Sequence, residues 1–165
     1  MTPMNSLIND LRDLPATVNE VDYRKQGYHL EVELTSGQVR EFASLLRDLS
    51  FYLVFVSAVH IAPVIQVIYQ FACFDRPCRI VSRAPVADDG SMPTISDIFD
   101  GANWHERETK DMFGVFFSGH PYLKPLLLTE EEPDLKPLLK SEDAVKTMDK
   151  ICRQANLSRE QDSNL

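Results

Sequence analysis

The chain has few cysteines and few glycines, and neither forms a pattern that would hold a cofactor. Its three cysteines, Cys73, Cys78 and Cys152, are an odd number without a Cys-x-x-Cys pair, so no disulfide framework, zinc site or cluster site is indicated. The six glycines are scattered, and none lies in an arrangement that cradles phosphates. We therefore expect no catalytic, cofactor-binding or metal-binding residues in this chain.

Long apolar runs and excess positive charge are also missing. The longest apolar region, residues 51–74, is interrupted by polar residues and a proline, whereas a spanning helix needs roughly 20 apolar residues in sequence. The N-terminus lacks the segments of a signal peptide, so we expect a cytoplasmic protein. The net charge of −8 argues against nucleic acid as a partner, because phosphate binding needs clustered basic residues.

Helical and strand-like patterns alternate along the first half of the chain. Apolar residues at helical spacing predict a helix over residues 4–14, ended by Pro15. A weak strand is expected at 16–23, and alternating apolar residues predict a clear strand over 28–34. A second helix follows, with its buried face made of the apolar residues Val39, Phe42, Leu45, Leu46 and Leu49.

Three runs rich in β-branched and aromatic residues come next, at 51–60, 64–74 and 78–82. Their connections are too short for crossover helices, so we predict an antiparallel meander. After a polar loop at 87–92, Thr94 is expected to cap a helix that Gly114 ends. The buried side of that helix is expected to hold Ile95, Ile98, Phe99, Ala102, Met112 and Phe113.

This order of elements predicts an α+β fold, with helices packed on a mostly antiparallel sheet. A single domain is expected over residues 1–128, followed by an acidic tail over 129–165. The tail is expected to contain an amphipathic helix capped by Ser141. The sequence Leu-Lys-Pro-Leu-Leu occurs at both 123–127 and 135–139, which fits either an apolar strap along a neighbour or chance.

The densest cluster of functional groups is the segment 103–114. Read as an enzyme, its acidic residues and His105 could form a general acid/base set. Read as a helix face, Glu106 with Lys110 and Arg107 with Asp111 are opposite charges at i,i+4 spacing. We favour the second interpretation, and we expect the ring of His120, which precedes Pro121, to be held by packing and a hydrogen bond.

Residues 102–121 resemble the signature of the thirty-kilodalton subunit family of respiratory complex I, with an AxWxERE pattern, a DxxG, an aromatic residue and GHPxL. The resemblance covers roughly residues 64–128. It implies the C subunit of NADH-quinone oxidoreductase or a related chain of membrane-bound group 4 [NiFe] hydrogenases. Such subunits lie in the cytoplasmic peripheral arm of an ion-translocating complex and carry no cofactor.

The resemblance also implies partners. These are a large catalytic subunit, of the forty-nine-kilodalton or hydrogenase large-subunit type, and a small iron–sulfur subunit. Iron–sulfur clusters, and nickel–iron in the hydrogenases, belong to the partners. Two departures from the respiratory pattern, Lys124-Pro125 in place of paired arginines and a missing second Gly-His-Pro-Leu-Arg-Lys-Asp-like segment, favour a hydrogenase-type relative.

The signature suits a docking device, because aromatic anchors dominate interface energetics and charges fix the partner. Trp104, Phe113, Phe116 and Phe117 are the expected anchors. The residues expected at the subunit interface are Trp104, Glu106, Arg107, Glu108, Asp111, Phe113, Gly114, Phe116, Gly119, His120 and Pro121. Two alternatives stay open: a free-standing acid/base enzyme using Glu106, Glu108 and His120, and a soluble adaptor outside any redox complex.

Overall fold

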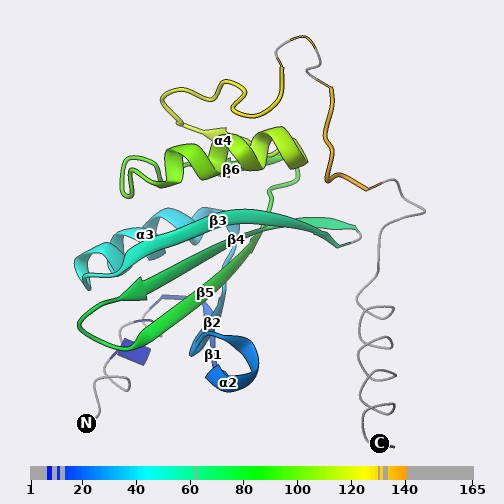
Figure 1. The fold of residues 1–165 in the computed structure, drawn as a ribbon. Helices are drawn as coiled ribbons and strands as arrows, with labels where there is room; N and C mark the ends of the chain where they lie inside the picture. Colours follow the sequence, from blue (N-terminus) through cyan, green and yellow to red (C-terminus); the bar gives the residue numbers. More distant parts are fainter. Residues whose placement is uncertain are drawn as a thin grey trace, which may run out of the picture.

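A mixed five-stranded sheet forms the centre of the computed structural model (Figure 1). Residues 7–8, 11, 14–61, 63–129, 131 and 134–140 are described. The strand order is β1-β2-β5-β4-β3, and a separate sheet pairs β6 with β7. In chain order the elements are β1 (Thr17–Glu20), α2 (Tyr23–Gln26), β2 (Leu30–Glu33), the 3-10 helix η1 (Ser36–Gln38), α3 (Val39–Asp48), β3 (Tyr52–Ile61), β4 (Val64–Cys73), β5 (Cys78–Pro85), β6 (Ser91–Pro93), α4 (Ala102–Phe113) and β7 (Phe116–Ser118).

The predicted meander is confirmed, since β3, β4 and β5 pair antiparallel in sequence order. The turn at 74–76 closes the second hairpin, so that Cys73 faces Cys78. One pairing of the five-stranded sheet is parallel: β2 lies beside β5, with α3 and two strands of the meander in the connection between them. The α+β class and the largely antiparallel sheet are therefore confirmed.

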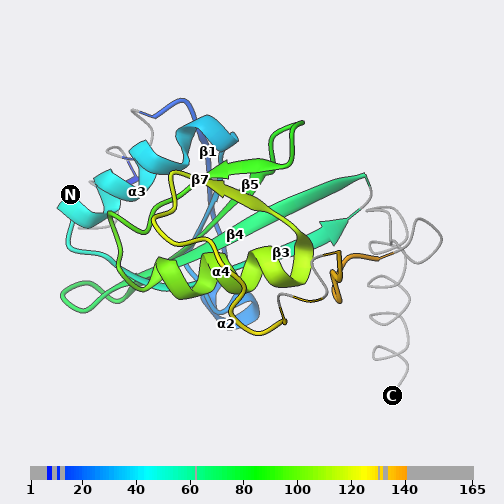
Figure 2. The same ribbon diagram turned by 90° about the horizontal axis from the view of Figure 1, so that it is seen from above.

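Both long helices cover the same face of the sheet, as Figures 1 and 2 show together. The predicted helix over 39–49 is confirmed, because α3 buries Val39, Phe42, Ala43 and Leu46. The ring of Phe42 meets that of Phe71 on β4 edge to face, with centroids 5.9 Å apart. Helix α4 packs against β3, so one apolar core lies between the sheet and the two helices.

The expected start of the last helix is wrong. The helix begins at Ala102 rather than near Thr94, and Ser91–Pro93 form the strand β6, parallel to β7. The physical reason is tertiary. The Thr94 hydroxyl binds Glu106, and Asp97 pairs with Arg40 at 2.6 Å, so neither caps a helix here.

The chain ends are described in part. Leu7, Ile8 and Leu11 are helical and buried, as predicted for residues 4–14. The weak strand expected at 16–23 is shorter, because α2 begins at Tyr23. The helix predicted after Ser141 lies outside the described residues, and the domain boundary after residue 128 stays a prediction. Among the described helices, none is long and apolar enough to span a membrane.

One buried hydroxyl allows a test of the core. Within the described part of the chain, the Tyr69 hydroxyl has no hydrogen-bond partner, and burial, with Glu106 nearby, raises the pKa of Tyr69 well above its usual value. Because an unsatisfied buried polar group is unfavourable, Tyr69→Phe should stabilise the chain by about 1 kcal/mol in urea unfolding. As a control, Phe71→Ala should destabilise it by about 3 to 5 kcal/mol. Destabilisation by Tyr69→Phe would contradict the prediction.

Candidate functional site

The signature residues lie on α4 and on the loop and strand that follow it. One side of α4 faces the core, with Ala102, Glu106, Thr109 and Phe113 buried, whereas Trp104 is exposed. The helix ends where Gly114 adopts the left-handed conformation, with φ of 80°, and donates its N–H to the Lys110 carbonyl at 2.8 Å. A side chain at Gly114 would be strained and would crowd Lys136.

Glu106 is the one glutamate among the described residues that is fully buried, with 0% of its surface exposed. Its carboxylate accepts hydrogen bonds from the Thr94 hydroxyl and from the Ile95 N–H, the latter at 2.8 Å. Thr94 also accepts a hydrogen bond from the Ser96 N–H at 3.1 Å. Burial raises the pKa of Glu106 to about 7, although these two donors partly offset it.

His120 lies beside Glu106, with its Nε2 atom 3.9 Å from the Glu106 Oε2 atom and neither side chain exposed. The ring is held at both nitrogens. Nδ1 accepts from the Tyr122 N–H at 3.0 Å, so Nε2 carries the hydrogen and donates it to the Asn103 carbonyl at 3.2 Å. Burial lowers the pKa of His120. The imidazole is therefore neutral, and the expected packing and hydrogen bond are present.

The three residues of the acid/base hypothesis are not brought together. Glu106 and His120 meet in the interior, whereas Glu108 is exposed on another side of α4. A general acid or base must touch its substrate, and neither buried side chain is accessible in this structure. The arrangement is that of a packed polar network.

Three charged residues of α4 hold the segment 123–128, which we name the strap. Asp111 is buried, and its Oδ2 atom accepts the N–H groups of Leu126, Leu127 and Leu128 at 2.8, 2.8 and 3.2 Å. Burial opposes ionisation of Asp111, but the three N–H donors outweigh it, and the pKa lies below its usual value. Figure 2 shows the chain after β7 crossing α4.

The other two contacts bind strap carbonyls. The Lys110 ammonium donates to the Leu123 carbonyl at 2.7 Å. The Arg107 guanidinium donates to the carbonyls of Lys124 and Pro125 at 3.0 and 2.9 Å. The predicted ion pairs Glu106–Lys110 and Arg107–Asp111 are therefore wrong. Each of these charged groups instead forms hydrogen bonds with residues outside α4, mostly with backbone groups that need a partner when they are buried.

The second Leu-Lys-Pro-Leu-Leu segment also reaches the end of α4, where the Leu138 N–H donates to the Met112 carbonyl at 3.1 Å. Leu135, Leu138 and Leu139 are exposed, as is Leu127 of the strap. Both copies therefore contact this chain's own helix through backbone groups, and the choice between an apolar strap along a neighbour and chance stays open.

The four expected aromatic anchors divide into two pairs. Phe113 and Phe117 belong to the core, whereas Trp104, with 64% of its surface exposed, and Phe116 face solvent. The Arg107 guanidinium lies over the ring of Trp104 at 5.7 Å and over that of Tyr122 at 5.1 Å. We name Trp104, Arg107, Tyr122 and the strap the signature surface.

The loop residues of the signature have turn roles. Gly119 adopts a φ of 81°, and Pro121 is exposed in the turn that follows His120. Sequence reasoning missed Thr94 and Tyr122 as site residues. Thr94 is distant from Glu106 along the chain and has no local signal for that contact, whereas an exposed aromatic residue next to the GHPxL pattern could have pointed to Tyr122.

The pKa of Glu106 predicts how stability depends on pH. Because it is about 7 in the folded chain against an ordinary 4.5, the protonated form is the stabilising one. Its contribution is present below pH 4.5 and is lost as the pH rises through 7, by up to about 3 kcal/mol. Glu106→Gln should remove this loss in urea unfolding monitored by circular dichroism from pH 5 to 8.

The control is Glu106→Ala, which leaves the Ile95 N–H without an acceptor and opens a cavity. It should destabilise the chain by about 2 kcal/mol or more at every pH. An unchanged pH dependence in Glu106→Gln would show that Glu106 is not the group responsible.

The Asp111 carboxylate should hold the strap in place. Asp111→Ala removes three charge-assisted hydrogen bonds, each worth about 1.5 to 3 kcal/mol. Hydrogen exchange at residues 126–128 should then be about tenfold faster or more, as measured by mass spectrometry. Glu108→Ala, at an exposed position of the same helix, should leave this exchange unchanged. Unchanged exchange in Asp111→Ala would mean that other contacts hold the strap.

The chain resembles subunits of respiratory complexes. It is 40% identical over 70 residues to the C subunit of NADH-quinone oxidoreductase from a Roseiflexus species, covering 42% of this chain and 40% of that one. It is 34% identical to the C subunit of F(420)H(2) dehydrogenase from Methanosarcina mazei, covering 46% and 49%. The chain thus matches less than half the length of either relative.

A solved structure has the same fold. A chain of an archaeal respiratory membrane complex, the membrane-bound sulfane sulfur reductase, superposes with a TM-score of 0.73 at 20% identity, covering 93% of this chain and 91% of that one. The family described as "Respiratory-chain NADH dehydrogenase, 30 Kd subunit" matches residues 32–148, which include α4, β7 and the strap. The chain therefore belongs to the respiratory-chain NADH dehydrogenase 30 kDa subunit family.

Proposed function

We propose that this chain is a non-catalytic subunit in the peripheral arm of a membrane-bound, ion-translocating redox complex, where it braces the large catalytic subunit. Family membership supports the assignment to such a complex. The observation that carries the bracing role is the signature surface, where Trp104 and Tyr122 remain exposed around Arg107. Exposed aromatic residues beside an arginine are typical of interface hot spots.

The signature residues that face the interior and those that face outward have different proposed roles. Inward-facing Glu106 and His120 fix the loops around α4, and Asp111 fixes the strap. The outward-facing side chains then form a surface whose shape is set before a partner arrives. A preorganised surface loses less conformational entropy on binding, which suits a subunit whose role is to hold another one in place.

The proposed partners are a large subunit of the forty-nine-kilodalton or hydrogenase type and a small iron–sulfur subunit. Iron–sulfur clusters, and nickel–iron in a hydrogenase, would belong to those partners. The chain would lie on the cytoplasmic side and meet the membrane only through them. Lys124-Pro125 favours a hydrogenase-type complex, and the relatives from NADH- and F(420)H(2)-oxidising complexes support the alternative equally.

Affinity purification of the tagged chain from its native membranes, with mass spectrometry and metal analysis, tests the proposal. Nickel with a hydrogenase-like large subunit would support the first assignment. Flavin with NADH-oxidising subunits would support a complex I. Recovery of the chain alone, free of metal, would overturn the bracing role and return attention to an enzyme or an adaptor.

The signature surface should be needed for assembly but not for folding. Trp104→Ser should lower recovery of the large subunit about tenfold or more, because hot-spot truncations cost about 2 kcal/mol or more. The free energy of unfolding should change by less than about 0.5 kcal/mol, as for other exposed sites. Val64→Ser, at the exposed start of β4, is the matched control and should leave recovery unchanged. Normal recovery with Trp104→Ser would exclude Trp104 as an anchor.

A further inference from the structure

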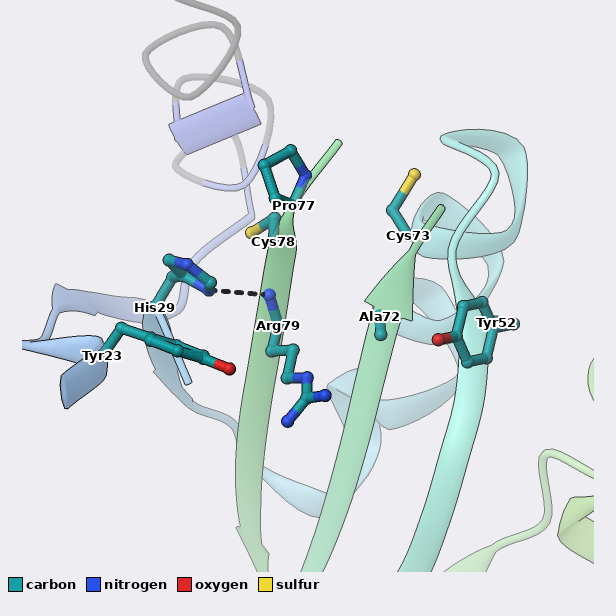
Figure 3. Close-up of a pocket in the computed structure, with 8 residues that line it drawn as sticks. All are labelled: Tyr23, His29, Tyr52, Ala72, Cys73, Pro77, Cys78 and Arg79. Carbon is teal, nitrogen blue, oxygen red and sulfur yellow. Dashed lines mark hydrogen bonds between the residues drawn. The ribbon is translucent and has the colours of Figure 1, made fainter. Parts of the chain in front are cut away.

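A second surface lies at the other side of the sheet. It is a pocket of about 340 Å³ lined by Tyr23, His29, Tyr52, Ala72, Cys78 and Arg79, together with neighbouring residues (Figure 3). These residues come from α2, from the segment before β2 and from the ends of β3, β4 and β5. None of them belongs to the signature.

The strand register places this pocket opposite the helices. Phe71 pairs with Ile80, and both side chains belong to the core under α3 and α4. The next pair, Ala72 with Arg79, therefore points to the other face, because side chains alternate along a strand. Tyr52 pairs with Ala72 and lies on that face too. The Tyr52, Ala72 and Arg79 side of the pocket thus lies on the opposite face of the sheet from the signature surface, whereas Cys73 and Cys78, which also line it, belong to the core.

Two aromatic stacks flank the pocket. Tyr23 stacks on His29 with centroids 4.5 Å apart, and Tyr52 stacks on Phe74 at 4.4 Å. Tyr23 and Tyr52 are exposed, and Phe74 has 86% of its surface exposed. Three exposed aromatic rings therefore lie around one pocket, and aromatic residues are enriched at protein interfaces.

An arginine lies between the stacks. In Figure 3 the Arg79 side chain extends between Tyr23 and the Ala72–Tyr52 side. Its backbone N–H donates to His29 Nδ1 at 3.0 Å, but among the described residues no carboxylate pairs with its guanidinium. Glu31, on the neighbouring strand, is already paired with Arg83 at 2.7 Å. Arg79 is exposed, so its guanidinium is accessible to an anionic group of another molecule.

The Cys78 and His29 side chains, which also line the pocket, do not neutralise the positive charge of Arg79. Burial raises the pKa of Cys78 to about 11, so its thiol is neutral near pH 7 and does not compensate Arg79. Since His29 Nδ1 accepts a hydrogen bond, its Nε2 carries the ring hydrogen and is a donor. The polar groups at the pocket, an arginine fork, an imidazole N–H and tyrosine hydroxyls, therefore suit a carboxylate.

We propose that this pocket binds an acidic side chain of a second partner subunit, whose neighbouring apolar residues cover Phe74 and Tyr52. The inference rests on the proposed function, since it needs a complex. A carboxylate is proposed because its charge complements that of Arg79. A protein is proposed rather than a small anion because a small anion would leave Phe74 uncovered. Aromatic residues and arginine are also the residue types enriched at protein interfaces.

The test places a photo-crosslinking phenylalanine analogue at position 74 of the tagged chain in its native membranes. After irradiation and purification of the complex, the crosslinked peptide should come from a partner subunit and contain Asp or Glu. Arg79→Gln should reduce its yield about tenfold or more. Arg47→Gln, at an exposed position on α3, is the control and should leave the yield unchanged.

The possible outcomes separate this inference from the proposed function. An intact complex without a crosslink from position 74 would overturn the inference alone. So would a crosslink to this chain's own residues, or a yield that Arg79→Gln leaves unchanged. Purification of the chain without any partner would instead overturn the proposed function, and the inference with it.

Discussion

The buried carboxylate of Glu106 is the constraint on which the arrangement around α4 depends. A carboxylate without exposure is unfavourable unless hydrogen-bond donors surround it, and the donors here come from Thr94 and the Ile95 backbone. The segment after β6 is therefore tied to the middle of α4. Beside this tie, β6 pairs with β7 and His120 packs against Glu106. Removing the carboxylate would remove the tie to Thr94 and Ile95, whereas the His120 ring would keep its own contacts with Asn103 and Tyr122.

Three other charged residues of α4 form hydrogen bonds with backbone groups. Asp111 accepts hydrogen bonds from three backbone N–H groups of the strap, while Arg107 and Lys110 donate to strap carbonyls. Such contacts do not depend on which side chains the strap carries; Leu127 is exposed, whereas Leu123, Leu126 and Leu128 are partly buried. A helix that holds a neighbouring segment in this way sets the shape of a surface without using the apolar groups that a partner would need.

Periodicity in the sequence predicted the elements that bury one continuous face, namely α3 and the three strands of the meander. It failed for β6 and β7, because three-residue strands carry no periodic signal. The helix start near Thr94 was misplaced because a good local capping residue has a stronger tertiary partner in Glu106. The role of the signature residues at a subunit interface stays a prediction, and i,i+4 spacing assigned Glu106, Arg107 and Asp111 the wrong partners. The pocket has no sequence signal, since its aromatic residues come from separate segments.

The two proposed surfaces are linked through the core by Phe71. Its ring contacts Phe42 of α3 and lies 5.4 Å from Phe99, in the segment leading to α4. The next residue along β4, Ala72, lies at the pocket on the other face. Moving one surface relative to the other would therefore disrupt close-packed core contacts, which interiors resist. If both proposed surfaces bind partners, the domain would act as a rigid spacer that fixes the distance between them.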